Sequence, residues 1–313
     1  MAMHTQERLD ADALKSTIEK YSSEFIIGAQ GPDIWLYHSS LPWSNSEMCR
    51  ITDEIGNIVH AERVNDFFAS CLNTIRSNPY EEQQLAMISY VAGHLCHWAL
   101  DSTAHPFIYY RTNGSTDETK YWHCRYEAMI DNYMMDPLKE EKRDCFPIKK
   151  LLNHDSLCEI AIQNLYYNAL KEVWDIEIRD KYTHDALKDF KSVLSYTSKK
   201  GFLYGLVYVY ETLTNNNWQF TSHFITGEKD DTRDILNLNH QIWFHPCDSS
   251  EVHHEDFLEL VEASIDKAVT ALELFSDALG NGEDEAFLKF IDNRNYETGL
   301  SHSEKMKYFD PIY

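Results

Sequence analysis

The chain has 313 residues, of which 43% are hydrophobic, and its formal net charge is −23 at pH 7. With no apolar run of membrane-spanning length, it is expected to be a soluble globular protein with an ample core and one or two domains. So acidic a chain is poorly suited to bind a nucleic-acid backbone or an anionic membrane surface, which favours a small or zwitterionic substrate.

The amino terminus lacks the basic and apolar regions of a secretory signal, which predicts a cytoplasmic protein. The seven cysteines are an odd number and include no CxxC motif. This pattern is typical of thiols in a reducing compartment, and it argues against thiolate zinc sites and thioredoxin chemistry.

Helical periodicity predicts a first helix over residues 11–27, ended by the glycine- and proline-containing turn that begins at Gly28. Asp33 closes this turn and begins the next element. Its carboxylate has two possible uses. It caps the start of a helix, which is the commoner role for such a residue, or it is available as a metal ligand.

Residues 38–46 are expected to form a loop. A helix over about 59–77 then has His60 in its first turn, where a histidine is more often a surface residue. The following helix, over about 81–105, is expected to end at Pro106, which cannot donate a helical hydrogen bond.

The 81–105 helix carries an unusual polar stripe. At about 100° per residue, His94, His97, Asp101 and His105 fall within roughly 80° of one another. Three imidazoles and a carboxylate make a poor core face, because each needs a partner once it is buried. The same side chains make a good metal-binding face.

The spacing along this stripe limits how many ligands one ion can have. His97 and Asp101 are four residues apart and can reach the same ion. His97 and His105 are about 12 Å apart along the axis, at about 1.5 Å per residue, so one ion cannot easily bind both. If all three are ligands, at least two metals are present and Asp101 is a possible bridge. The alternative is a helix end with solvated or hydrogen-bonded histidines.

A polar loop over 111–118 is followed by a helix over about 119–135. This helix repeats the four-residue spacing, with His123 and Glu127 on one face. Taken alone, a local hydrogen-bonded or solvated pair would be the favoured interpretation. It is the second pair of this kind in the chain.

The second half of the chain also reads as helices, and no βαβ alternation or strand-rich stretch interrupts them, so an all-α fold is predicted. The predicted helices cover about 155–174, 184–213 and 252–280. Residues 201–210 are apolar on all sides and are expected to be buried. We predict a metal-binding helical core over 1–146 and a helical half over 147–313 that packs on it as one continuous domain.

The ordered motifs of the first half resemble those of one family. They are Gly31-Pro32-Asp33, His60-Ala-Glu62, His97-Trp-Ala-Leu-Asp101-Ser-Thr-Ala-His105-Pro106 and His123-Cys-Arg-Tyr-Glu127. The set resembles the zinc-dependent phospholipase C family over roughly residues 22–135, with fainter similarity around 236–260. The resemblance implies an all-α, multi-helical bundle with a multinuclear zinc site, related to the fungal single-strand nucleases.

The resemblance also implies a ligand set. One zinc would be held by Asp33, His60, His97 and Asp101, and a second by His105, His123 and Glu127. A third zinc in the family shares the bridging aspartate and uses a histidine near the chain start, for which His4 is the candidate. That site also uses a processed amino-terminal tryptophan, which this sequence does not have at its start, so two or three zinc ions are implied.

Catalysis would follow from metal chemistry. Paired zinc ions activate a water for attack on a phosphodiester, with Asp33 as general base and Glu62 orienting His60. The expected substrate is a phospholipid or a similar small phosphodiester. The alternatives are a nuclease or nucleotidase on the same scaffold and a metal-binding protein without turnover. Iron or manganese could occupy such sites in place of zinc.

Overall fold

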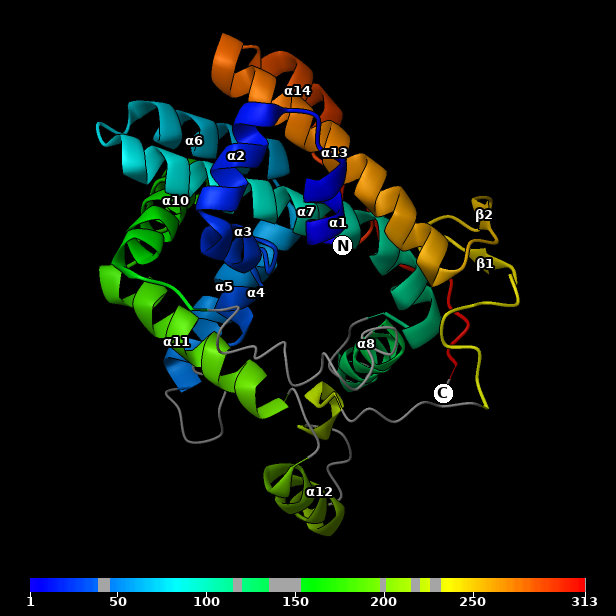
Figure 1. Ribbon diagram of the computed structural model, residues 1–313. Coiled ribbons are helices and arrows are strands. Elements are labelled where there is room, and N and C mark those ends of the chain that lie inside the picture. The colour runs from blue at the N-terminus through cyan, green and yellow to red at the C-terminus, as the bar shows by residue number, and fades with distance from the viewer. Residues whose placement is uncertain are drawn as a thin grey trace. The chain divides into compact units, whose positions relative to one another are not determined.

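The computed structural model describes residues 1–38, 46–114, 120–134, 153–197, 201–214, 220–225 and 232–312. In these residues the fold is helical, which confirms the all-α prediction (Figure 1). The one described sheet pairs two short antiparallel strands, β1 (Trp243–Phe244) and β2 (Val252–His253), with Trp243 opposite His253. None of the described helices is long and apolar enough to cross a bilayer.

The chain divides into two compact units, each assembled from separate stretches of sequence. The first unit contains Met1–Thr103, Leu151–Phe190 and Val261–Ser303, and the second contains Ala104–Lys150, Lys191–Leu260 and Glu304–Tyr313. The predicted boundary after residue 146 lies outside the described residues, so the division into 1–146 and 147–313 stays a prediction.

The first unit is built mainly from the amino-terminal helices. It contains α1 (Ala2–Arg8), α2 (Asp12–Lys20), α3 (Ser22–Gly28), α4 (Asp33–Leu36), α5 (Ser46–Ala61), α6 (Val64–Ser77), the larger part of α7 (Glu81–Thr112), α10 (Ser156–Trp174), the first part of α11 (Asp180–Thr197), most of α13 (Phe257–Asn281) and α14 (Asp284–Ile291). Helix α6 packs against both α10 and α14. The core of the first unit includes Phe68, Trp98 and Tyr166, which are all fully buried.

Two glycines set the close crossing of α3 and α7. A Cβ atom on Gly28 would lie 2.1 Å from the carbonyl oxygen of Tyr90, and one on Gly93 would lie 2.1 Å from that of Phe25. Only glycine leaves room for two backbones at this distance. The crossing brings the turn after α3 against the middle of α7, where the polar stripe is found.

Helix α7 continues past Pro106 to Thr112, contrary to the predicted end at the proline. Proline removes one hydrogen bond, the one to the carbonyl of Ser102, at a cost of about 3 kcal/mol, and burial of the residues that follow offsets this cost. Phe107 is fully buried and its ring contacts those of Trp243 and Tyr126. Packing of the residues after the proline therefore outweighs its local effect.

The second unit includes the carboxyl-terminal end of α7. It contains α8 (Lys120–Met134), the end of α11, α12 (Phe202–Thr214), the short 3₁₀ helix η2 (Thr221–His223), both strands and the start of α13. Helix η2 contacts both α8 and α12. Residues 304–312 also belong here, and the backbone N–H of Asp310 donates to the carbonyl oxygen of Tyr110.

Several predicted helix boundaries need correction. The helix predicted over 11–27 is broken at Tyr21, and the one predicted over 59–77 is two helices, with His60 near the end of α5. The predicted helix over 184–213 is likewise α11 and α12. Its apolar segment 201–210 is exposed along most of its length, not buried as expected, because only one face of α12 contacts another described element.

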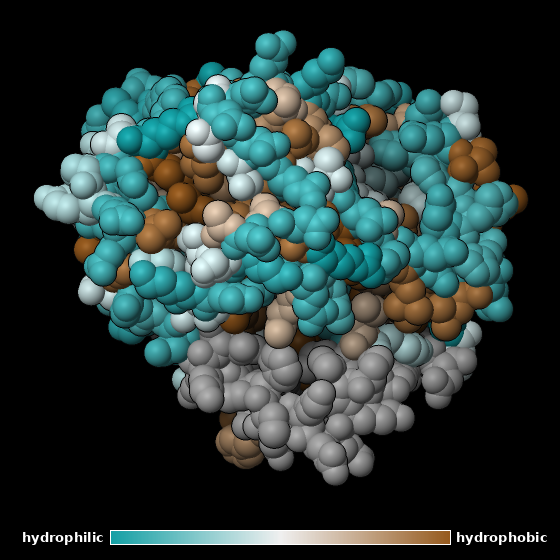
Figure 2. Space-filling model, turned by 45° about the horizontal axis from the view of Figure 1, so that its top comes forward, coloured by the Kyte–Doolittle hydropathy of each residue, from teal (hydrophilic) through white to brown (hydrophobic). Residues whose placement is uncertain are grey.

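Hydrophilic side chains lie mainly at the surface, and most of the described cysteines lie in the interior. Hydrophilic residues cover most of the face seen in Figure 2, as the net charge of −23 leads one to expect. None of the six described cysteines forms a disulfide, and Cys71, Cys96, Cys158 and Cys247 are buried. Burial raises the pKa of the Cys96 thiol to about 12, and it raises that of Cys71 further.

Candidate metal centre

Three separate helices of the first unit bring Asp33, His60 and His97 together. Asp33 is the first residue of α4, His60 lies near the end of α5, and His97 lies in the middle of α7. One potential ligand atom from each lies within 4.8 Å of the other two. Residues from distant parts of the sequence thus form one compact donor set, made of three of the four residues that the resemblance assigns to one zinc ion.

The turn before Asp33 is shaped by Gly31. Its φ angle is +52°, which lies in the left-handed region, and a Cβ atom there would lie 2.1 Å from Cδ2 of His97. Glycine is therefore required twice, for the backbone angle and for direct contact with the imidazole ring. This contact fixes the distance between Asp33 and α7.

The hydrogen bonds of His60 indicate that a positive charge belongs at this site. Nδ1 of His60 lies 2.7 Å from the carbonyl oxygen of Gly56, which can only accept, so Nδ1 carries a hydrogen. Nε2 then lies 3.3 Å from Oδ1 of Asp33 and 4.0 Å from Oδ2 of Asp101. A neutral imidazole would direct a lone pair at two carboxylates, so either a second proton or a metal ion must lie between them.

Asp101 belongs to the same group of side chains. It is buried, and its Oδ2 lies 3.0 Å from Nε2 of His97, one helical turn earlier. Two imidazoles and two carboxylates are a donor set that zinc, iron and manganese all accept. The residues present therefore fit a divalent ion.

A second donor set lies in the second unit and consists of His105, His123 and Glu127. Oε1 of Glu127 lies 3.3 Å from Nε2 of His105 and 3.1 Å from Nε2 of His123. The ring of His123 stacks on that of Tyr109 at 4.8 Å. Burial raises the pKa of the Glu127 carboxyl group, but the two imidazoles lower it more, so the net pKa is well below its ordinary value.

Comparison with known proteins agrees with this geometry. The family model for zinc dependent phospholipase C matches residues 1–190. The chain belongs to the zinc-dependent phospholipase C family. Searches of curated proteins and of solved structures gave no match. The matched region contains both donor sets, and membership of this family implies a zinc-dependent phosphodiester hydrolase.

Two buried residues, His94 and Tyr296, lie beside the first donor set of this member of the zinc-dependent phospholipase C family. His94 is 1% exposed, its Nε2 lies 2.8 Å from the hydroxyl oxygen of Tyr296, and burial lowers its pKa well below the ordinary value, so it is neutral. The ring of Tyr296 contacts those of His60 and His97. The neighbouring position of His94 was expected, but Tyr296 has no local sequence signal.

Two residues of the predicted site lie elsewhere. The imidazole of His4 is 69% exposed, lies 3.2 Å from Glu7, and belongs to neither donor set. Glu62 accepts a hydrogen bond from the indole of Trp174 at 3.3 Å. The ring of His60 is oriented by the Gly56 carbonyl instead, one helical turn earlier, which corrects the role predicted for Glu62.

A third potential donor set, His240, Asp256 and Glu259, has a structural explanation. Asp256 accepts a hydrogen bond from the backbone N–H of Glu259, and Glu259 accepts one from that of Asp256. This reciprocal pair caps the start of α13. His240 and Glu259 are exposed, so the group is best explained as a helix cap.

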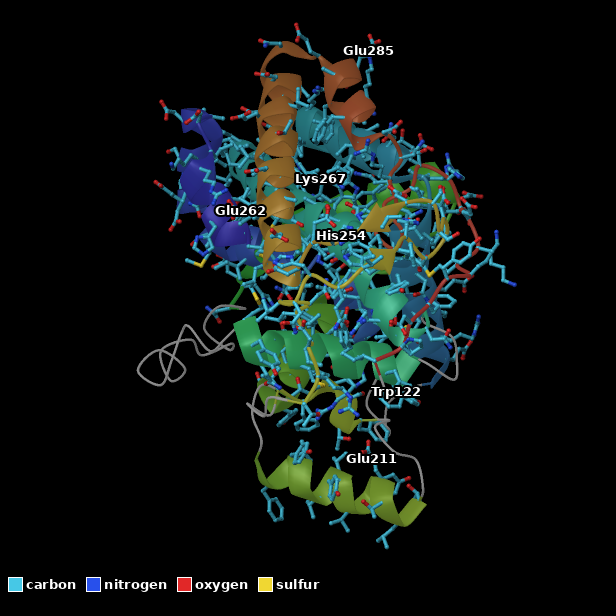
Figure 3. The ribbon with its side chains drawn as sticks, turned by 90° about the vertical axis from the view of Figure 1, so that its right-hand side faces the viewer. Trp122, Glu211, His254, Glu262, Lys267 and Glu285 are labelled. Atoms are coloured by element: carbon cyan, nitrogen blue, oxygen red, sulfur yellow. The ribbon has the colours of Figure 1, made fainter. Side chains whose placement is uncertain are left out.

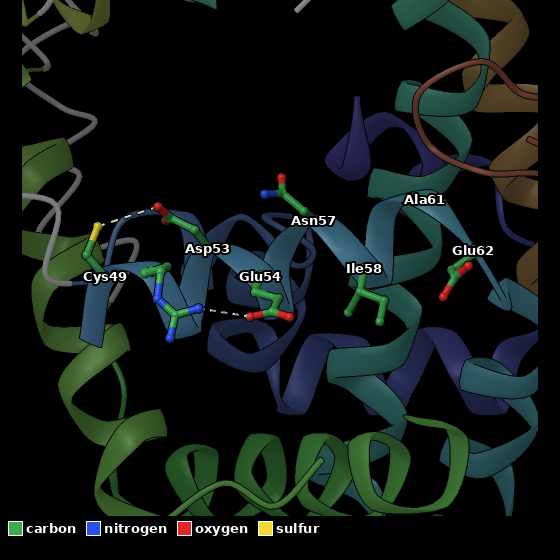
Figure 4. A pocket seen from close by; sticks show the side chains of 8 residues that line it. Cys49, Asp53, Glu54, Asn57, Ile58, Ala61 and Glu62 are labelled. Atoms are coloured by element: carbon green, nitrogen blue, oxygen red, sulfur yellow. Dashed lines mark hydrogen bonds and ion pairs between the residues drawn. The ribbon is translucent and has the colours of Figure 1, made fainter. Parts of the chain in front are cut away.

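A shallow cavity of about 620 Å³ follows the outer face of α5 (Figure 4). It is lined by Cys49, Arg50, Asp53, Glu54, Asn57, Ile58, Ala61 and Glu62. Arg50 pairs with Glu54 at 3.7 Å, which leaves the lining acidic overall. The cavity ends next in sequence to His60, and its charge suits a cationic group better than a phosphate.

Proposed function

We propose that the chain is a metal-dependent phosphodiesterase that hydrolyses a phospholipid or a similar small phosphodiester. The observation that carries the proposal is the convergence of imidazoles and carboxylates into two donor sets, in a chain of this family. In this proposal Asp33, His60, His97 and Asp101 hold one zinc ion. The other three residues, His105, His123 and Glu127, hold a second, and His4 holds none.

The chain's own residues have distinct roles in this proposal. Bound zinc would acidify a water and polarise a phosphoryl oxygen. Asp33 is the best candidate for general base, because its side chain is 36% exposed and so can accept a proton from a water that enters from solvent. The carbonyl of Gly56 holds the ring of His60 in the orientation that presents Nε2 to the ion.

The test compares three classes of substrate on protein of known metal content. We expect hydrolysis of a chromogenic phosphocholine ester, slower hydrolysis of bis-nitrophenyl phosphate and none of single-stranded DNA. Metal analysis should find two zinc ions per chain. Faster cleavage of DNA than of the phosphocholine ester would favour a nuclease, and bound zinc without any hydrolysis would favour a metal-binding protein without turnover.

A control separates the catalytic role of Asp33 from a structural one. Asp33→Asn keeps the size of the side chain and should lower kcat strongly while the helical content is retained. The exposed Asp12, at the start of α2, offers a matched substitution to asparagine that should leave turnover unchanged. An Asp33→Asn protein with wild-type kcat would contradict the assignment of general base.

A further inference from the structure

Helix α12 exposes an apolar stripe that no described element covers. Phe202, Leu206, Val209 and Leu213 recur at intervals of three and four residues, so they share one face of the helix. Their exposed fractions are 85%, 53%, 55% and 81%. Monomeric proteins rarely expose contiguous apolar side chains in this way unless the surface binds something.

The opposite face of α12 is firmly attached. Glu211, which is 2% exposed, accepts hydrogen bonds from the backbone N–H groups of Phe220 and Thr221, and its other oxygen accepts one from the Thr221 hydroxyl (Figure 3). The ring of Tyr204 packs against that of Phe224. The helix is therefore oriented, with its charged residue inward and its apolar stripe outward.

Through η2, helix α12 is connected to the helix that carries part of the second donor set, and all three elements lie in the same unit. Helix η2, which Glu211 holds, packs on α8, the helix that carries His123 and Glu127. One short element thus connects the apolar stripe to candidate metal ligands.

We propose that the outer face of α12 docks on the surface of a neutral, zwitterionic lipid bilayer, an inference that rests on the proposed function. The helix has one charged residue, Glu211, which is buried, so its outer face offers nothing to anionic lipid. Tyr208 and Tyr210 are each more than half exposed, and tyrosine favours the boundary between lipid and water. At 13 residues, about 20 Å, the helix lies in an interface and does not span one.

The test measures binding to phosphatidylcholine vesicles by flotation. The triple variant L206E/V209E/L213E should bind about tenfold or more weakly than the wild-type chain, because charge on the stripe opposes insertion. A matched control, Y80E/I160E/Y167E, places the same three charges on exposed apolar residues outside α12 and should bind like the wild type. Far-UV circular dichroism checks that each variant is folded.

A gain-of-binding variant keeps the proposal testable if the triple variant fails to fold. A Cβ atom at Gly205 meets nothing within 4 Å, so Gly205→Trp adds an aromatic ring in open space beside the stripe. It should bind vesicles about threefold more tightly or better. Equal binding by the wild type, the triple variant and Gly205→Trp would overturn the proposal.

Two further outcomes are distinguishable. If the wild type does not bind vesicles and forms a dimer that L206E/V209E/L213E breaks, the stripe is a contact between two copies and the proposal is wrong. If vesicle binding behaves as expected but no phosphodiester is hydrolysed, docking stands and the proposed function fails. Unchanged hydrolysis of the water-soluble ester by the triple variant would confirm that the stripe contributes to lipid binding and not to turnover.

Discussion

At the scale of single residues, Gly31 is the position where the backbone of the turn before Asp33 lies directly against the His97 ring. We predict that Gly31→Ala destabilises the protein by about 1–3 kcal/mol, because φ is +52° and the new Cβ would overlap the His97 ring. Chemical denaturation measures the change. Gly280→Ala, in open space within α13, is the control and should be neutral or stabilising. A Gly31→Ala protein with wild-type stability and metal content would contradict this reading.

Asp101 is the second residue whose substitution is informative. Asp101→Asn keeps the size of the side chain but removes the charge that lies 3.0 Å from Nε2 of His97. We expect the loss of at least one zinc ion per chain and a fall in kcat of about 100-fold or more, since even residues behind the ligands contribute 10- to 100-fold. Mass spectrometry of metal content is the readout. The exposed Asp10 provides a substitution to asparagine that should retain both ions.

At the scale of elements, α13 carries a lysine that makes stability depend on pH. Nζ of Lys267 donates to the hydroxyl of Ser102 at 2.7 Å and lies 4.5 Å from the ring centre of Trp98. Burial, and secondarily the charge of Arg294, lowers its pKa to about 7. In the unfolded chain its pKa is about 10.5. Between these values this lysine binds more protons in the unfolded state, so its own contribution to stability rises with pH.

Buried thiols with a raised pKa, such as that of Cys96, act in the opposite direction above about pH 8.5. We therefore predict a difference between two proteins: from pH 7.5 to pH 9.5, the free energy of unfolding of the wild-type protein rises more, or falls less, than that of Lys267→Met. Denaturant titrations at the two pH values measure both. Lys289→Met, at an exposed position of α14, should keep the pH dependence of the wild type. The same pH dependence in Lys267→Met and in the wild-type protein would contradict the role of Lys267.

Elements held by local signals were predicted well. Helices α8 and α10 begin and end within one residue of the predicted bounds, and Asp155 caps α10 by accepting hydrogen bonds from the backbone N–H groups of Leu157 and Cys158. The pairs His97/Asp101 and His123/Glu127 were recognised for the same reason, because four-residue spacing is a local property of a helix, whereas Asp33 and His60 were assigned only through the resemblance to the family.

Features that depend on distant contacts were not predicted. Tyr296 lies about 200 residues from His94, and nothing near it in sequence marks its place beside the imidazoles. The continuation of α7 past Pro106 depends on burial of Phe107 against other elements. The exposure of 201–210 was missed because hydrophobic composition does not reveal whether a partner covers a helix.

At the scale of the whole molecule, the proposal places one donor set in each of the two units. Metal removal should therefore destabilise the protein, because an ion that binds only the folded state contributes about 4 kcal/mol at a concentration 1,000-fold above its Kd. We predict that EDTA lowers the melting temperature and that two equivalents of zinc restore it. Magnesium added in place of zinc is the control and should not. A melting temperature unaffected by EDTA would argue against bound metal in either unit.

The buried thiols allow the local opening of each unit to be measured. Cys71 lies in the first unit and Cys247 in the second, and both are closed to solvent in the folded state. Because alkylation requires an accessible thiolate, the rate at which each sulfur is labelled reports how often its own unit opens. Peptide mapping after timed alkylation would thus follow the local opening of the two units separately, without any substitution in the sequence.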